Sequence, residues 1–207
     1  MLLQEISEKI YVVNLKKRKD RLHHITNELQ KINCSKYEIV EAIDGSQIDN
    51  PTKMKNGNYG LNLTYIKIHE DWSKNKTQTV LIIEDDCCFS DNFNDELKNY
   101  IENIPKDWDI IYFGANHNYH IGYQTEKINE FCKKLTNSIC AHIVIMKNYV
   151  FEELIQEIKK NKLENDVILS NLQKKYNAYS PNNRLTKQLE NFSDIEGSIT
   201  NYDKLIN

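Results

Sequence analysis

The chain has 207 residues, of which 28% are charged and 40% are hydrophobic, and its formal net charge is −3. This length suits one domain, and the composition is that of a folded, soluble protein rather than a disordered one. A net negative charge provides no basic field that could hold a polyanion, so we do not expect nucleic acid as a partner. No apolar run approaches the roughly 18 residues that cross a bilayer, and Met1–Glu8 lacks a secretory signal pattern. We therefore expect a cytoplasmic protein without a transmembrane segment.

Strand and helix patterns alternate along the first half of the chain. Lys9–Leu15 is a β-branched apolar run typical of a buried strand, and apolar residues spaced by three and four predict an amphipathic helix over 18–32. The next expected elements are a strand at 37–40, a loop over 46–60, a helix at 61–72, a strand at 79–83, a helix at 92–104 and a strand at 109–113.

The second half begins with the polar, irregular stretch 115–137, for which a mobile loop and a small hairpin both remain open. A strand at 139–146, helices at 149–160 and 167–175, and an extended tail at 180–207 complete the expected elements. Alternating strands and helices predict a single α/β domain over residues 1–207, with a mainly parallel central sheet flanked by helices. In such sheets ligands bind beyond the carboxyl ends of the strands.

Three consecutive carboxylates, Glu84-Asp85-Asp86, follow the most apolar predicted strand. Unpaired charge is costly next to a buried sheet, so these groups are either solvated or neutralised by a cation. Mn²⁺ and Mg²⁺ prefer carboxylate oxygens and bridge them to phosphates. Because side chains alternate along an extended chain, we expect Glu84 and Asp86 on one face and Asp85 on the other. A charged turn before the next helix explains the triplet equally well.

Five cysteines with irregular spacing and no C-x-x-C pair predict free thiols rather than a zinc site. His142 falls in a strand pattern, which favours a core histidine over a metal ligand. The cluster His117–His120 lies in a polar loop, which favours a solvated position.

Several segments form an ordered set of motifs. These are Ile10–Arg21, Glu41–Gly45, Gly57–Trp72, Leu81–Asp86 and Pro105–Gly114, followed by Asp166, Pro181, Gln188 and Ser193–Ile195. In this order they resemble glycosyltransferase family 25, which includes bacterial lipopolysaccharide galactosyltransferases and collagen glycosyltransferases. One departure is that Thr64-Tyr65 stands where the family has a Ser-His pair.

The resemblance implies a GT-A-like fold and a metal-dependent, inverting transfer of galactose or glucose from a UDP-sugar donor. The metal would be Mn²⁺, with Mg²⁺ as the alternative. The acceptor would be a hydroxyl of a glycan, a lipooligosaccharide or a hydroxylysine residue. The tail 180–207 would close the donor site. The alternative for the cluster His117–His120 is contact with the acceptor sugar.

Roles for individual residues also follow from the resemblance. Donor binding falls to Asn14, Leu15, Arg18, Arg21, Asp44, Thr64, Glu84, Asp85 and Gln188, and metal binding to Asp86 and Asp194. Asp166 becomes the candidate general base, although an Asp there also suits a helix N-cap. Arg18 and Arg21 can equally be helix-face charges, and Asp44 can be a turn residue before Gly45.

Two other functions remain open from the sequence. A catalytically silent module that binds a nucleotide-sugar or a glycan would keep the same fold. A metal-dependent nucleotidyltransferase or phosphotransferase would share the acidic cluster but show no preference for nucleotide-sugars.

Overall fold

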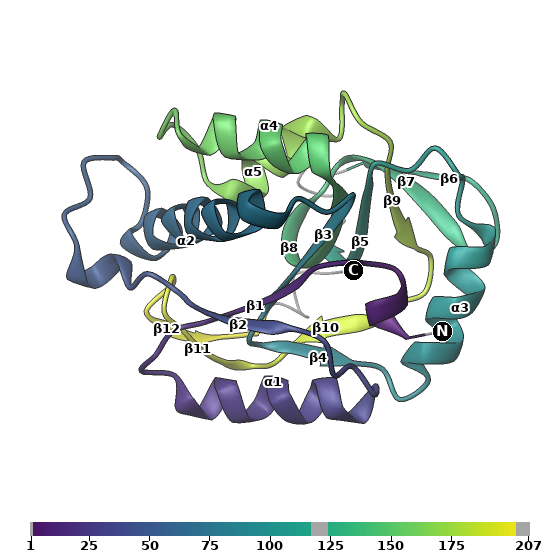
Figure 1. Cartoon of the computed structure of the whole chain (residues 1–207), viewed down its shortest axis with the longest axis horizontal. Helices are drawn as coiled ribbons and strands as arrows, with labels where there is room; N and C mark the ends of the chain where they lie inside the picture. Colours follow the sequence, from purple (N-terminus) through teal and green to yellow (C-terminus); the bar gives the residue numbers. More distant parts are fainter. Residues whose placement is uncertain (1, 117–123, 202–207) are drawn as a thin grey trace.

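The computed structural model describes residues 2–116 and 124–201, and its centre is an eight-stranded sheet of order β2-β1-β3-β8-β5-β9-β7-β6 (Figure 1). The sheet strands are β1 (Ile10–Asn14), β2 (Glu38–Glu41), β3 (Thr79–Glu84), β5 (Ile110–Asn116), β6 (Gln124–Lys127), β7 (Cys132–Asn137), β8 (Ile139–Lys147) and β9 (Ala178–Pro181). Strands β7 and β8 pair antiparallel with all their neighbours, so the other six described strands point the same way. The expected α/β architecture with a mainly parallel sheet is confirmed.

Helices cover both faces of the sheet. They are α1 (Lys19–Lys31), α2 (Asn56–Trp72), α3 (Phe93–Asn103), α4 (Asn148–Ile158) and α5 (Asn165–Leu172). Helices α2, α4 and α5 pack on one face and form what we call the α2-side core, while α1 and α3 form the α1-side core on the other. Strand β3 contributes side chains to both cores, because Val80 and Ile82 face α2 whereas Leu81 and Ile83 face α1.

Helix α2 begins at Asn56, so the loop predicted over 46–60 is wrong for its last five residues. Two glycines suggested a loop, but both serve close packing. A Cβ on Gly60 would lie 2.4 Å from the carbonyl oxygen of Ile43. Gly60 therefore lets the turn after β2 rest directly on the first turns of α2, which positions one wall of the pocket described below.

The stretch 115–137 forms a hairpin over its described part, where β6 pairs antiparallel with β7. The histidine cluster His117–His120 lies outside the described residues. The tail is more ordered than an extended coil, because it contains β10 (Thr186–Gln188), β11 (Asn191–Ser193) and β12 (Ser198–Thr200). β10 pairs with β4 (Cys87–Phe89), and β11 pairs with β12. This pairing brings the tail beside the end of β3.

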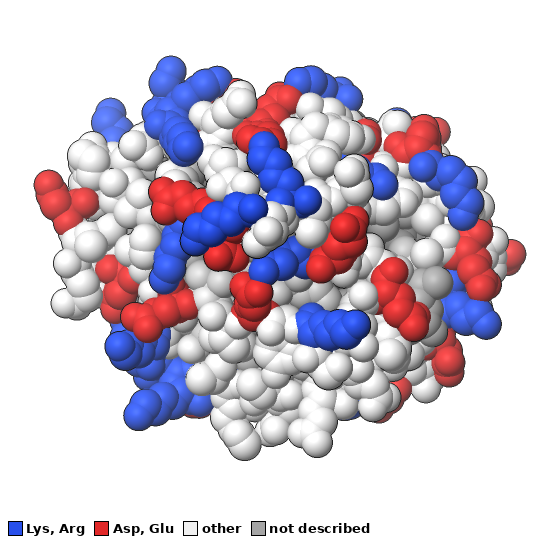
Figure 2. Space-filling view, viewed as in Figure 1, with Lys and Arg blue, Asp and Glu red and all other residues white. Residues whose placement is uncertain are grey.

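Within residues 2–116 and 124–201, no helix is both long and apolar enough to cross a membrane. All five cysteines are free thiols, as predicted. On the face seen in Figure 2, Lys and Arg side chains are interspersed with Asp and Glu.

Candidate functional site

A pocket lies where the parallel strands β1, β2 and β3 end, between the first turn of α2 and the tail. Its lining includes eight of the predicted site residues, namely Leu15, Arg21, Asp44, Glu84, Asp85, Asp86, Gln188 and Asp194. The rule that ligands bind beyond the carboxyl ends of parallel strands therefore located this pocket correctly.

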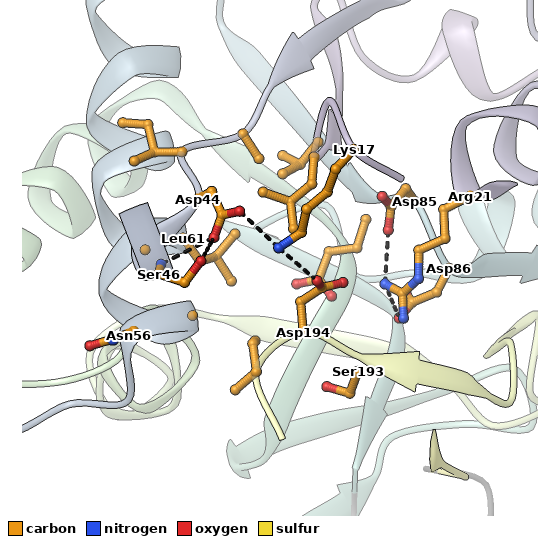
Figure 3. A pocket seen from close by; sticks show the side chains of 18 of the residues that line it. Lys17, Arg21, Asp44, Ser46, Asn56, Leu61, Asp85, Asp86, Ser193 and Asp194 are labelled. Atoms are coloured by element: carbon orange, nitrogen blue, oxygen red, sulfur yellow. Dashed lines mark hydrogen bonds and ion pairs between the residues drawn. The ribbon is translucent and has the colours of Figure 1, made fainter. Parts of the chain in front are cut away.

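Asp85 and Asp86 are buried, and both form ion pairs with the side chain of Arg21. Arg21 Nη1 lies 3.0 Å from Asp85 Oδ1 and 3.3 Å from Asp86 Oδ2 (Figure 3). Asn14 Nδ2 also donates to Asp85 Oδ2 over 2.7 Å. The expected separation of Asp85 from Asp86 is wrong, because β3 ends at Glu84 and the chain turns there, which ends the alternation of a strand. Burial raises the pKa of both carboxyls, and Arg21 opposes this shift.

Glu84 is partly buried and forms no ion pair with any residue in the described ranges. Its burial and the charges of Asp86, Asp85 and Asp166 raise its pKa to about 8. Arg21 opposes this shift but does not cancel it, so ionised Glu84 is only partly compensated by positive charge. A bound cation would supply that charge.

The tail contributes a further oxygen next to Asp86. The backbone N–H of Leu189 donates to the carbonyl oxygen of Asp86 over 2.7 Å, which fixes β10 against the turn after β3. Gln188 Nε2 lies 3.5 Å from Asp86 Oδ1, while the buried Gln188 Oε1 has no hydrogen-bond partner among the described residues. Among those same residues, no three of His, Cys, Asp and Glu gather closely enough to hold a metal by themselves. The carboxylates and the free amide oxygen suit a hard cation that takes its remaining ligands from a phosphate or water.

Basic side chains from the segment after β1 hold the tail across the pocket. Lys17 Nζ lies 2.8 Å from Asp44 Oδ2 and 3.2 Å from Asp194 Oδ1 (Figure 3). Arg18 Nη1 lies 2.6 Å from Asp194 Oδ2, and both Arg18 and Arg21 donate to the carbonyl oxygen of Phe192. Lys17 and the Ser46 hydroxyl lower the pKa of Asp44. Asp194 therefore forms ion pairs with Lys17, which lines the pocket, and with Arg18, which borders it.

Two more contacts fix the tail on α2. A Cβ on Gly57 would lie 2.8 Å from the side chain of Ile195, so only glycine admits this approach. Lys55 and Glu196 form an ion pair of 2.6 Å. The tail is thus held from the β1 side and from the α2 side.

Asp166 lies in the first turn of α5 and not in the pocket lining. The N-cap alternative is wrong, since Glu164 occupies the N-cap. Burial raises the pKa of Asp166, while the backbone N–H groups of Val167 and Cys140 stabilise its charged form. Cys140 has a φ of 63°, a left-handed conformation that is unfavourable for a residue with a Cβ. The Asp166 charge also raises the pKa of Glu84, so Asp166 lies near this residue of the pocket lining.

Three predicted donor contacts lie behind the pocket wall. Asn14 orients Asp85, and Arg18 holds the tail. The Thr64 hydroxyl is fully buried, donates to the Gly60 carbonyl and accepts from the Ile43 N–H. Both hydrogen-bonding functions of this hydroxyl therefore serve the pocket wall.

Several residues that line the pocket had no individual site role predicted from the sequence. They are Val13, Lys17, Ala42, Ile43, Gly45, Ser46, Asn56, Gly57, Leu61, Ser193 and Ile195. Lys17 stands in the densest basic run of the sequence, Lys16-Lys17-Arg18-Lys19, which allows either a solvated helix start or a local phosphate-binding role. His142 is a buried core residue as expected, and burial lowers its pKa to about 3.

Known proteins resemble the chain in sequence and in fold. It is 28% identical over 130 residues to procollagen galactosyltransferase 2 of Mus musculus, covering 52% of this chain and 20% of that protein. It is 26% identical over 164 residues to the procollagen lysyl hydroxylase and glycosyltransferase of Acanthamoeba polyphaga mimivirus, covering 65% of this chain and 18% of that protein. The chain thus spans about a fifth of the length of these relatives.

Among solved structures, the inositol-1-phosphate CTP transferase from T. maritima matches with a TM-score of 0.52 and 10% identity, covering 91% of each chain. This likeness concerns the fold alone. The sequence model of glycosyltransferase family 25 (LPS biosynthesis protein) matches residues 7–160. Three quarters of the chain carries the match, and the chain belongs to glycosyltransferase family 25.

Proposed function

We propose that residues 1–207 form a single glycosyltransferase domain that transfers galactose or glucose from a UDP-sugar, with inversion and a divalent metal. The acceptor would be a hydroxyl of a glycan, a lipooligosaccharide or a hydroxylysine residue. One observation carries the proposal. In a family 25 chain, three consecutive carboxylates and a basic segment meet in a pocket at the ends of parallel strands. The galactosyltransferase name of the mouse relative supports galactose as the first donor sugar to test.

Asp86 and Asp194 would hold the metal, with Mn²⁺ our first choice and Mg²⁺ the second. Gln188 Oε1, which has no hydrogen-bond partner in the described part of the chain, and the raised pKa of Glu84 support a cation here. When bound, the cation would offset charge on the leaving diphosphate. Asp194 would first have to leave Lys17 and Arg18.

The basic segment is suited to the diphosphate. Lys17 and Arg21 line the pocket, and Arg18 borders it through Asp194. As the bond between C1 of the hexose and the diphosphate breaks, negative charge develops on the departing phosphate, and these cations would stabilise it. Asp44 and Asp85 would accept hydrogen bonds from the ribose or uracil, beside the apolar side chain of Leu15.

Asp166 would act as the general base. The acceptor oxygen would attack C1 on the side opposite the diphosphate, and the hydroxyl proton would pass to the Asp166 carboxylate. Burial raises the pKa of Asp166, which makes its carboxylate a stronger base. Its place in the first turn of α5, outside the lining of the donor pocket, suits an acceptor that approaches from the α5 side.

The tail would close the site over the donor. Its present contacts use the cations that the diphosphate needs, so donor binding would exchange Asp194 for phosphate at Lys17 and Arg18. The closed tail would also exclude water, which otherwise competes with the acceptor.

Calorimetry with UDP, with and without Mn²⁺, tests the donor site. UDP release from UDP-galactose and UDP-glucose then tests the reaction. We expect Mn²⁺-dependent UDP binding and release from one of the two donors. Absence of Mn²⁺-dependent binding would contradict the proposal, and binding without release or transfer would instead indicate a silent binding module.

A further inference from the structure

The Tyr65 hydroxyl is buried without a partner. Tyr65 on α2 is 0% exposed, and its hydroxyl oxygen makes no hydrogen bond with the described residues. The Asn165 side chain lies beside it, but this contact does not meet hydrogen-bond geometry. Leaving a buried polar group unpaired costs about 1–3 kcal/mol. Phenylalanine would avoid this cost, so the hydroxyl itself requires an explanation.

The alternation of β3 turns Glu84 toward the face that holds Tyr65. Tyr65 packs in the α2-side core together with Val80 and Ile82. Leu81 and Ile83 belong to the opposite core. Glu84 is the last residue of β3 and follows the parity of Val80 and Ile82, so its side chain leaves the sheet on the α2 side. Helix α5, with Asn165 and Asp166, covers this same face.

The electrostatics agree with this placement. Burial raises the pKa of Tyr65, and Glu84 is the largest of the charges that raise it further. Neither Glu84 nor Asp166 forms an ion pair with a described residue. A neutral O–H donor is therefore the kind of group that can stabilise Glu84 from this side without removing its charge.

We propose that Tyr65 is a positioning residue, whose hydroxyl donates a hydrogen bond to the Glu84 carboxylate when the site is loaded for reaction. This hydrogen bond would hold Glu84 at a fixed place in the pocket lining, near Asp166. Tyr65 itself does not line the pocket, so it acts through Glu84. The inference rests on the proposed function and adds a residue that the donor site alone does not identify.

The test compares Tyr65→Phe with Tyr100→Phe. Tyr100 on α3 is 2% exposed and its hydroxyl also lacks a partner within residues 2–116 and 124–201, but it packs in the α1-side core. Each substitution removes one buried, unpaired hydroxyl, so neither should lower the melting temperature. We expect only Tyr65→Phe to lower kcat for UDP release, by about 10-fold, with UDP affinity in Mn²⁺ changed less than twofold.

A kinetic double-mutant cycle tests the route through Glu84. In a Glu84→Gln background, Tyr65→Phe should lower kcat no further. Equal kcat for wild type and Tyr65→Phe would overturn the inference. So would a lower melting temperature, which indicates a structural hydroxyl, or a loss confined to donor affinity. A wild-type chain that neither binds UDP nor releases it would refute the proposed function and this inference together.

Discussion

The carboxylates at the end of β3 fall into two regions that differ in how their charge is balanced. Asp85 and Asp86 share Arg21, and across the pocket Asp194 pairs with Lys17 and Arg18. Glu84 and Asp166 lie on the α2 and α5 side and form no ion pair with a described residue. Backbone N–H groups stabilise the charged form of Asp166, while Arg21 only partly offsets the factors that raise the pKa of Glu84.

The difference arises from one feature of the backbone. Glu84 keeps the alternation of β3 and faces the α2-side core, whereas the turn at Asp85 and Asp86 directs both carboxylates to Arg21. A single acidic triplet thus serves two environments. The region with paired cations suits an anionic diphosphate, and the region without them suits proton transfer, where a raised carboxyl pKa is useful.

The largest expected effect comes from Asp86. Asp86→Asn should abolish Mn²⁺-dependent UDP binding and lower turnover by about 10²-fold or more, because it removes a predicted metal ligand. The fold should remain intact, since the amide is nearly isosteric. Calorimetry and UDP-release rates measure the effect. Asp71→Asn is the control, because Asp71 lies away from the pocket, where it accepts from the Tyr11 hydroxyl. UDP affinity in Mn²⁺ that stays at the wild-type value would rule out the metal assignment.

Asp166→Asn should affect the other region selectively. We expect kcat to fall by about 10²-fold, with UDP affinity unchanged, because only the proton acceptor is lost. Glu164→Gln, two residues earlier at the start of α5, serves as the matched control. A variant with normal kcat and weakened UDP binding would place Asp166 on the donor side, and the comparison between the two regions would fail.

Glu84→Gln tests whether the raised pKa of the Glu84 carboxyl makes the free energy of unfolding depend on pH. Between the ordinary pKa of 4.5 and the folded pKa of about 8, the unfolded chain has lost a proton that the folded chain retains. The free energy of unfolding should therefore fall as pH rises through this window, by up to about 1.4 kcal/mol per pH unit. From pH 6 to 7.5 this amounts to roughly 2 kcal/mol.

Urea unfolding in metal-free buffer measures this effect. The Gln variant should have a flatter pH profile than wild type, while Glu152→Gln, which removes a surface partner of Lys76, should not change the slope. Mn²⁺ should stabilise wild type at pH 7.5. Parallel pH profiles for wild type and Glu84→Gln would show that Glu84 is compensated after all.

Much of this arrangement could be predicted from the sequence, since the apolar run before Glu84 and its position in an α/β pattern located the pocket. The resemblance to family 25 added Arg21 and Gln188, which are far from Glu84 in sequence. A charged turn was one of two explanations that the sequence left open for the triplet, but its start at Asp85 could not be predicted, because strand periodicity does not say where the strand ends. The helical start at Asn56 was also not predicted, because Gly57 and Gly60 normally indicate a loop. Here they allow close contacts with residues that are distant in sequence, which the local pattern does not reveal.

Substitution of Asp194 gives the smallest expected effect. In the proposed function this residue both holds the tail closed and binds the metal. Asp194→Asn should let UDP bind about fivefold more tightly without metal, close to 1 kcal/mol, because Lys17 and Arg18 no longer share their charge with a carboxylate. The further gain on adding Mn²⁺ should shrink, because the same change removes a predicted metal ligand. Glu196→Gln is the control. Glu196 belongs to the same tail, but it lies outside the pocket lining and pairs with Lys55 at the start of α2. If metal-free UDP affinity falls in Asp194→Asn, Asp194 does not compete with phosphate, and the tail stays closed by its other contacts when the donor binds.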